Sequence, residues 1–370
     1  MSSESPEFDV AVVGAGPAGS ATALDLRRRG ISVVVLESRP AAVWKIGETL
    51  PPAARPLLQA LGVLEAFESD GHLLSYGNHS AWGSEGLDSK DFIFGPHGNG
   101  WQLDRKRFDE RLAEAAGSAG ACLWYESRFL AARRCGDAIW ELKVAVARDR
   151  RVIRVRWLVD ATGRSNTVAR HLGARRSALD ALFCVYAVAR PASCGALPDA
   201  DTRTLVEAAA EGWWYTALMP GGRRTVAWLT DQDLLRRHPW RTGTWFVSHI
   251  RATRHLSKLL DRHDYGFAEP PRCSSACSGR AEPWCGAGWL AVGDAAMTFD
   301  PLSSQGLWNA LATGDHAART VAESLDGDRL SLPRYSIDLE EVWEAYVRNR
   351  LEFYRIEQRW AGEPFWRRRH

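Results

Sequence analysis

Short apolar runs that end at a glycine or an acidic residue are the most regular pattern along this chain. Continuous apolar runs of this length are typical of strands buried on both faces, as in a parallel sheet. They cover residues 8–13, 31–36, 152–159 and 289–292. The pattern therefore predicts an α/β fold whose central strands are far apart in the sequence.

Other segments alternate between apolar and polar residues, which is typical of half-buried strands. Such strands are expected at residues 76–84, 91–94, 123–129, 138–147, 182–189, 213–219 and 225–230. The segments at 182–189, 213–219 and 225–230 are assigned to a second sheet, and 76–84 is expected to begin a sheet apart from the first. Helices are expected at residues 57–67, with a break at Gly62, at 104–116 and over much of 233–260. Two more are expected, one from just after Leu307 to about residue 325 and one at 340–358. Gly47 and the Pro51–Pro52 pair argue against a regular element over residues 46–52.

The turn after the first predicted strand has the G-x-G-x-x-G spacing, at Gly14, Gly16 and Gly19. Gly14 allows a sharp turn, Gly16 lets a pyrophosphate approach the backbone, and Gly19 lets the next helix pack against the strand. The helix N-terminus offers N–H groups to phosphates. Glu37 ends the second strand, where a ribose hydroxyl needs an acceptor. The alternative is a glycine turn in an unrelated α/β protein.

Composition narrows the possible partners and compartments. The chain has 370 residues and a net charge of +2, so no charge excess indicates nucleic acid. Seven cysteines without paired knuckles predict free thiols in the cytoplasm and no metal site, including at Cys273, Cys277 and Cys285. No signal peptide and no membrane span are expected, because the N-terminus is polar and no apolar run reaches the required length. The seventeen tryptophans are expected mainly in the core, with some lining an aromatic pocket.

Three strand–turn segments together resemble the flavoprotein monooxygenases and flavin-dependent halogenases. They are the Gly14 turn, Asp160-Ala161-Thr162-Gly163-Arg164, and Gly293-Asp294-Ala295-Ala296 followed by Asp300-Pro301. The resemblance implies a three-layer FAD-binding Rossmann-like domain with an inserted mixed β-sheet substrate domain and C-terminal helices. It implies an FAD domain at 1–75, 98–178 and 272–330, a substrate domain at 76–97 and 179–271, and a helical segment at 331–370.

The same resemblance assigns cofactor contacts. In this family the Gly293-Asp294 turn closes on the flavin ribityl and phosphate groups, and a helix after Pro301 points its N-terminus at the flavin ring. The implied FAD-binding residues are Gly14, Gly16, Ala18, Gly19, Glu37, Ser38, Arg39, Arg105, Gly163, Asp294, Pro301, Gln305, Gly306 and Leu307. Arg39 has two interpretations, as a cation beside the pyrophosphate or as a solvated loop charge.

A narrower likeness is to the flavoproteins that mature tryptophylquinone cofactors. It is carried by 46–52, 100–105, 212–215, 300–306 and 354–366. It implies hydroxylation, through a C4a-hydroperoxyflavin, of an electron-rich ring such as the indole of a tryptophan in a partner peptide. Glu48 is the candidate acid/base or a structural acceptor. His79 and Trp82 are candidate pocket residues, although for His79 a surface or core role is favoured.

Departures from the family leave alternatives open. The Asp-Gly motif that links FAD to NAD(P)H is absent, so NAD(P)H and a separate flavin reductase are both possible electron donors. Halogenation is the first alternative. Halogenases use a lysine near the substrate, and the lysines here are Lys45, Lys90, Lys106, Lys143 and Lys258, of which Lys90 has a tolerable position in an exposed turn. Tailoring of a free natural product, double-bond reduction, and flavin binding without turnover are the others.

Overall fold

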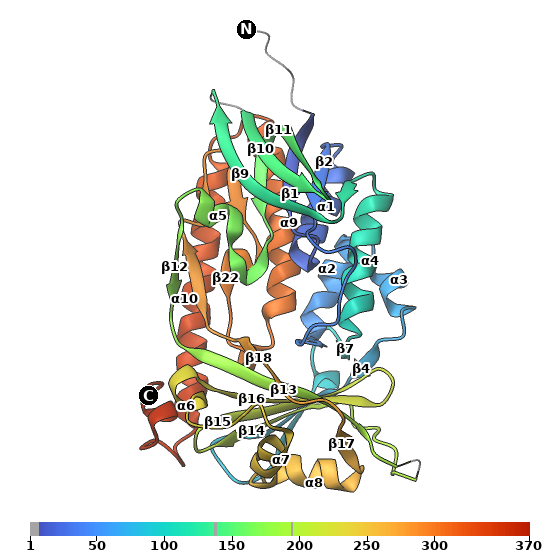
Figure 1. Cartoon of the computed structure of the whole chain (residues 1–370), viewed down its shortest axis with the longest axis vertical. Helices are drawn as coiled ribbons and strands as arrows, with labels where there is room; N and C mark the ends of the chain where they lie inside the picture. Colours follow the sequence, from blue (N-terminus) through green and yellow to red (C-terminus); the bar gives the residue numbers. More distant parts are fainter. Residues whose placement is uncertain (1–6, 137–138, 194) are drawn as a thin grey trace.

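The computed structural model describes residues 7–136, 139–193 and 195–370. Expectations for residues 1–6, for the start of the strand at 138–147 and for one of the cysteines, Cys194, lie outside this part. Two large β-sheets stand toward opposite ends of the long axis, and helix α10 (Ser331–Ile356) runs along one side between them (Figure 1). No helix within the described ranges is both long and apolar enough to cross a membrane.

The continuous apolar runs form the first sheet. Its strand order is β20-β21-β11-β1-β2-β8, with β10 paired to β11 and β9 paired to β10. Strands β21, β11, β1, β2 and β8 pair parallel in that order. Most residues of β1 and all residues of β2 and β21 are buried, as is typical of the centre of a parallel sheet. The strands are β1 (Phe8–Val13), β2 (Val33–Leu36), β8 (Cys122–Trp124), β9 (Ser127–Cys135), β10 (Ile139–Val146), β11 (Asp149–Asp160), β20 (Cys285–Gly286) and β21 (Trp289–Ala291).

The long strand β11 belongs to two layers. Its first half pairs antiparallel with β10, and its second half, from Val155 onward, pairs parallel with β1. The meander of β9, β10 and β11 is therefore continuous with the parallel strands. Helix α1 (Pro17–Arg28) packs against both α4 (Arg105–Ser118) and α9 (Gly306–Leu325), and all three contribute to the same core. Helices, parallel strands and meander form the three predicted layers.

The alternating segments at 76–84, 182–189, 213–219 and 225–230 contribute strands to the second sheet, which has the strand order β17-β13-β16-β15-β14-β5-β6 with β18 beside β13. Those at 123–129 and 138–147 belong to the first sheet. The sheet is mixed, because β14 and β5 run parallel whereas the other neighbours run antiparallel. The strands are β5 (Gly77–Ala81), β6 (Asp88–Asp91), β13 (Leu182–Pro191), β14 (Thr204–Ala209), β15 (Gly212–Met219), β16 (Arg223–Asp231), β17 (Tyr265–Phe267) and β18 (Arg272–Ser275).

The two faces of the second sheet pack against different partners. Trp214 and Trp228 face helices α7 (Gly243–Arg251) and α8 (His255–Arg262), together with residues of α6 (Gln232–Leu235). Trp213, one position away on β15, packs instead with residues of α10 and α11 (Pro364–Arg367). This is the period of two that a strand imposes. The side of Trp213 is also the side that faces the first sheet.

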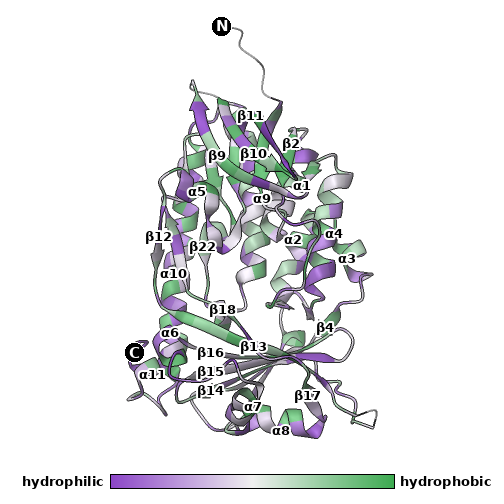
Figure 2. Cartoon of the chain, in the orientation of Figure 1, coloured by the Kyte–Doolittle hydropathy of each residue, from purple (hydrophilic) through white to green (hydrophobic). Residues whose placement is uncertain are grey.

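Short elements complete the fold. Two smaller sheets have the orders β12-β19-β22 and β3-β7-β4. Their strands are β3 (Thr49–Leu50), β4 (Leu73–Ser75), β7 (Gly100–Gln102), β12 (Arg175–Ala178), β19 (Gly279–Glu282) and β22 (Met297–Thr298). The short helices are η1 (Pro52–Ala54), α2 (Arg55–Ala60), α3 (Leu64–Glu68), η2 (Phe92–Phe94), η3 (Gly163–Ser165), α5 (Thr167–His171), η4 (Gly293–Ala295) and η5 (Pro301–Ser303). In Figure 2 the hydrophobic colour covers most of β13, whereas β9 changes between hydrophobic and hydrophilic colour along its length.

The expected α/β class, the second mixed sheet and the C-terminal helices are confirmed. Three local expectations were wrong. Residues 92–94 form the 3-10 helix η2 rather than a strand. The segment at 46–52 contains β3, because β7 offers it a pairing partner far along the chain, with Thr49 opposite Gln102 and Leu50 opposite Trp101. Helix α10 begins at Ser331 and not near 340, since Pro333 lies in its first turn, where proline is tolerated.

Candidate active site

A cleft of about 1030 Å³ lies between the two large sheets. At one end it is lined by the loop that joins β1 to α1. At the other end it is lined by side chains of the second sheet: Cys184, Tyr186, Tyr215, Ala227 and Leu229. One continuous space thus reaches from a glycine turn to an aromatic and apolar wall, which is the shape that a long ligand together with a flat substrate would need.

The three glycines of the turn have different surroundings. Gly14 has a φ of +109°, and a Cβ there would lie 2.3 Å from the carbonyl oxygen of Ala161. A Cβ on Gly19 would lie 2.0 Å from the carbonyl oxygen of Gly14. A Cβ on Gly16 would meet nothing within 4 Å, although Gly16 lines the cleft. Gly14 and Gly19 therefore close the turn, and Gly16 leaves space in front of it.

The start of α1 offers donors to that space. Gly16 is the N-cap residue, and no side chain caps the helix. The free N–H groups and the positive end of the helix dipole favour an anion such as a pyrophosphate. Helix α9 also begins without a side-chain cap, and its Gly306 lines the cleft with open space where a Cβ would be. Two helix N-termini are therefore available along one cleft.

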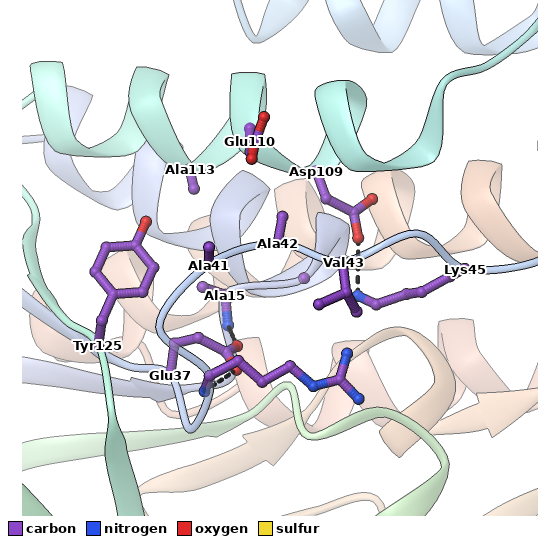
Figure 3. A pocket seen from close by; sticks show the side chains of 12 residues that line it. Ala15, Glu37, Ala41, Ala42, Val43, Lys45, Asp109, Glu110, Ala113 and Tyr125 are labelled. Atoms are coloured by element: carbon purple, nitrogen blue, oxygen red, sulfur yellow. Dashed lines mark hydrogen bonds and ion pairs between the residues drawn. The ribbon is translucent and has the colours of Figure 1, made fainter. Parts of the chain in front are cut away.

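Glu37 is fixed beside the glycine turn. Its carboxylate accepts hydrogen bonds from the backbone N–H of Ala15 and of Arg39, both at 2.9 Å. Figure 3 shows this carboxylate at the edge of a smaller pocket of about 50 Å³, with Tyr125 and helix α4 on the other sides. On α4, Asp109 holds Lys45 with a distance of 2.8 Å between Nζ and Oδ2. The carboxylate retains unused acceptor positions for a ribose hydroxyl.

The cleft brings together most of the sequence-predicted cofactor residues. Those that line it are Gly14, Gly16, Ala18, Glu37, Ser38, Arg39, Arg105, Gly163, Asp294, Pro301, Gly306 and Leu307. Gly19 and Gln305 stand beside it, in the closed turn and at the N-cap of α9. Gly163 has a φ of +65°, and Asp294 lies 3.4 Å from Arg164 in the adjoining turn.

Arg105 lines the cleft, but its guanidinium already has partners. It contacts both carboxylate oxygens of Asp109 and donates to the carbonyl oxygens of Ile46 and Gly47. Its side chain is 8% exposed. This arrangement ties the 45–47 loop to α4, so Arg105 shapes the wall of the cleft. Contact between Arg105 and a cofactor phosphate stays a prediction.

The three candidate catalytic residues lie in different places. Glu48 is fully buried next to the cleft-lining residues Gly47 and Thr49. His79 is hydrogen-bonded to Ser89 and to Asp201, and Trp82 packs on Trp213 and donates to the carbonyl oxygen of Phe353. Neither His79 nor Trp82 is among the described residues that line the cleft. Their roles stay predictions that this geometry does not favour.

The sequence led us to expect tryptophans in an aromatic pocket but did not identify the residues that form the aromatic wall of the cleft. Tyr186 and Trp44 both line it and pack against each other, with ring centroids 6.0 Å apart. Tyr215 lines it from β15. A signal for the wall was present: Cys184 and Tyr186 on β13, and Ala227 and Leu229 on β16, follow the period of two that places residues on one face.

The profile of the family described as FAD binding domain matches residues 7–350. The chain belongs to this FAD-binding family. It is an FAD-dependent oxidoreductase, and FAD is its cofactor. The residues present fit that cofactor, since open space lies in front of Gly16 and Gly306 and both helix N-termini are uncapped. The predicted FAD-type fold is thereby confirmed. The assignment of individual residues to FAD stays a prediction.

Two relatives span most of the chain. LodB of Marinomonas mediterranea, provisionally named an FAD-dependent oxidoreductase, is 27% identical over 98% of this chain and 97% of its own length. A 1H-pyrrole-2-carbonyl-[peptidyl-carrier protein] brominase of Pseudoalteromonas luteoviolacea is 24% identical over 90% of this chain and 82% of its own.

Solved structures share the fold. The myxobacterial chondrochloren halogenase CndH has a TM-score of 0.87 and 22% identity, and covers 98% of this chain and 85% of its own. The peptidyl tryptophan dihydroxylase QhpG has a TM-score of 0.74 and 24% identity, and covers 98% and 78% respectively.

Proposed function

We propose that this FAD-dependent oxidoreductase attaches a halogen or an oxygen atom to an electron-rich aromatic ring that lies against the second sheet. The observation that carries the proposal is the continuous cleft, which joins the glycine turn to the wall of Tyr186, Tyr215 and Leu229. Reduced FAD supplies the electrons that activate O₂ in such reactions. The flat rings of Trp44 and Tyr186 suit a flat aromatic substrate.

Relatives favour halogenation over the hydroxylation that the sequence led us to place first. One relative is a brominase of a pyrrole ring on a carrier protein, and another, from Pseudomonas fluorescens, is the corresponding chlorinase. The structural neighbour CndH is also a halogenase. Halogenation of the ring is therefore the first candidate reaction.

Hydroxylation is the second candidate, because of where the lysines lie. Lys45 lines the cleft, but its Nζ is paired with Asp109 at the end near Glu37. Lys90 lies on the exposed strand β6. Lys106, Lys143 and Lys258 are not among the described residues that line the cleft. A halogenase of the type that the sequence resembles needs a lysine beside the substrate, whereas a hydroxylase does not. QhpG is named for dihydroxylation of a peptidyl tryptophan.

The substrate ring is proposed to be attached to a larger molecule. The brominase and QhpG are named for a ring held on a carrier protein and for a tryptophan within a peptide. By analogy, we infer a pyrrole or indole ring on a carrier protein or peptide. The electron donor stays open between NAD(P)H and a separate flavin reductase.

The test uses the holoprotein, a flavin reductase with NADH, and O₂. Free tryptophan, a tryptophan-containing peptide and a pyrrole-2-carboxyl thioester are offered with and without bromide. Mass spectrometry then distinguishes three results. A brominated ring that requires bromide supports halogenation, and a ring that gains an oxygen atom regardless of bromide supports hydroxylation. If every ring is recovered unchanged while NADH is consumed, ring modification of these classes is wrong.

A further inference from the structure

Tyr215 connects the cleft to a buried carboxyl group. It lies on β15 and lines the cleft from the same face as Trp213. Its Oη donates to Glu48 Oε1 at 2.5 Å and lies 3.1 Å from Thr49 Oγ1. A tyrosine hydroxyl can both donate and accept a proton. Tyr215 therefore stands between the space for the substrate and a group that can take a proton from it.

Glu48 cannot touch a substrate directly. Its exposed fraction is 0%, and its Oε2 accepts a hydrogen bond from the backbone N–H of Gly47 at 3.0 Å. Burial raises the pKa of Glu48, and the hydrogen bond from Tyr215 opposes that change only in part. Burial and the nearby Glu48 raise the pKa of Tyr215 well above its ordinary value, so the phenol keeps its proton at rest.

The charged and titratable groups around this pair have partners of their own. Arg105, on α4, reaches the loop as far as the carbonyl oxygen of Gly47 and is paired with Asp109. Lys45 is also paired with Asp109. From β13, the buried thiol of Cys184 approaches, and burial raises its pKa strongly, so it stays neutral. Tyr215 is therefore the group through which a proton can pass between the cleft and Glu48.

A hydrogen-bonded chain holds the pair in place from behind. Thr49 Oγ1 donates to Gln102 Oε1 at 2.8 Å. Gln102 Nε2 lies 3.0 Å from Thr204 Oγ1 and 3.3 Å from Ser75 Oγ. Gln102, Thr204 and Ser75 are all buried. A satisfied buried network of this kind fixes side-chain orientation, here of Tyr215 toward the cleft.

We propose that Tyr215 is the catalytic residue that removes the ring proton, with Glu48 as the positioning residue that receives a proton behind it. The inference rests on the proposed function. After a halogen or oxygen electrophile bonds to a ring carbon, that carbon still carries its hydrogen. The C–H bond breaks, and its electron pair restores the aromatic ring. The released proton binds Tyr215 Oη as the original phenolic proton moves to Glu48 Oε1. The sequence pointed to Glu48 as the acid/base, and the geometry transfers the contact with substrate to Tyr215.

The experiment compares Tyr215→Phe, Glu48→Gln and a matched control, Tyr265→Phe. Tyr265 lies at the edge of the same sheet, outside the cleft, and its hydroxyl donates to Asp199 at 3.1 Å. Single-turnover product formation is measured with the reduced holoprotein, O₂ and a substrate deuterated at the reacting ring carbon. Thermal unfolding and FAD affinity report whether each variant remains folded.

Tyr215→Phe is expected to slow product formation by about 100-fold or more while FAD affinity is retained. It is also expected to produce a primary deuterium isotope effect, because loss of the ring proton becomes rate-limiting. Glu48→Gln is expected to do the same, and Tyr265→Phe to behave as the wild type. An infrared carbonyl band from a protonated carboxyl is expected to grow in during the single turnover of the wild type, and to be absent from both Tyr215→Phe and Glu48→Gln.

Two failures are distinguishable. A wild-type protein that modifies none of the rings overturns the proposed function and this inference with it. A wild-type protein that modifies a ring, combined with a Tyr215→Phe variant of equal rate and no isotope effect, overturns the inference alone.

Discussion

Gly14 and Gly16 are two positions apart but have opposite constraints. Gly14 has a left-handed φ and no room for a side chain, because the carbonyl oxygen of Ala161 lies against it. Gly16 has an extended backbone with φ −71° and ψ 179°, which any residue can adopt, and empty space in front of it. The fold therefore requires the first glycine, whereas the space in front of the second is open to a ligand.

Alanine substitutions separate these two requirements. Gly16→Ala is expected to leave the free energy of unfolding of the apoprotein unchanged and to weaken FAD binding by tenfold or more, about 1.4 kcal/mol. Gly14→Ala is expected to lower the free energy of unfolding by about 1–3 kcal/mol, because its Cβ would clash. Urea unfolding and FAD fluorescence titration measure both. Unchanged FAD affinity in Gly16→Ala would show that the space before the turn does not hold the cofactor.

The stability of the protein should depend on pH through Glu48. Its pKa is raised by burial above its ordinary value of 4.5. The folded state then binds the proton more tightly than the unfolded chain. This tighter proton binding contributes to the free energy of unfolding in full below about pH 4.5, and the contribution is lost as the pH rises through the pKa of Glu48 in the folded state.

Glu48→Gln removes this pH-dependent contribution. The wild-type free energy of unfolding minus that of the variant is therefore expected to fall as pH rises. Urea unfolding of both proteins, from below pH 4.5 to neutrality, measures this difference. Titrating groups that the two proteins share cancel in it. A difference that increased with pH would mean that Glu48 is held ionised in the folded state.

At the residue scale, the sequence could predict which residues lie together where the signal was local. Gly14, Gly16 and Glu37 come from one strand–turn–helix–strand unit, so spacing alone brings them together. Glu48 and Tyr215 are 167 positions apart. They meet only because the small sheet that contains β3 packs near β15 of the second large sheet. Their pairing could not be derived from spacing.

At the scale of elements, helix α10 joins the two halves of the molecule. Tyr335 and Tyr346 belong to the core of the first sheet, whereas Tyr354 packs with the second. Near its end, Arg350 pairs with Asp300 and Asp180, and Tyr354 donates to Asp300 at 2.8 Å. Asp300 immediately precedes the turn that leads into α9. The C-terminal helix thereby fixes the turn at the cleft.

Removal of this buried pair should be costly. Arg350→Met leaves two carboxylates unpaired, at sites where the Arg350 and Asp300 side chains are 9% and 1% exposed. We expect the free energy of unfolding to fall by about 3–5 kcal/mol. Arg334→Ala on the same helix is the control, because Arg334 is 51% exposed, so solvent screens its ion pairs and the variant should change the free energy of unfolding much less. Equal effects in urea unfolding would contradict the structural role of the Arg350 pair.

Element boundaries were harder to predict than element types. The helix α9 ends at Leu325 as expected, and the break at Gly62 separates α2 from α3. Strand β3 was missed because two residues carry no periodicity, and only its pairing with β7 makes it a strand.

At the scale of the whole molecule, ligand binding should stabilise both sheets together. The cleft takes its walls from both of them, and α10 packs in the cores of both. Free FAD at a hundred times its Kd is expected to add about 2.7 kcal/mol. The fluorescence of the second-sheet tryptophans, among them Trp213 and Trp214, should report this shift to the same extent as circular dichroism. A tryptophan transition that ignored FAD would mean that the second sheet unfolds independently.

The alternation of side chains in the second sheet also matters for how such an enzyme can change. Cys184, Tyr186, Ala227 and Leu229 face the cleft, while their neighbours in sequence, Val185, Val226 and Trp228, face α7 and α8. The cofactor end of the cleft is built from separate loops. Substitutions at the four cleft-facing positions can thus reshape this wall of the cleft while the opposite core and the glycine turns keep their sequences. We therefore expect the range of ligands to change through single, compatible substitutions, in evolution and in a focused mutant library.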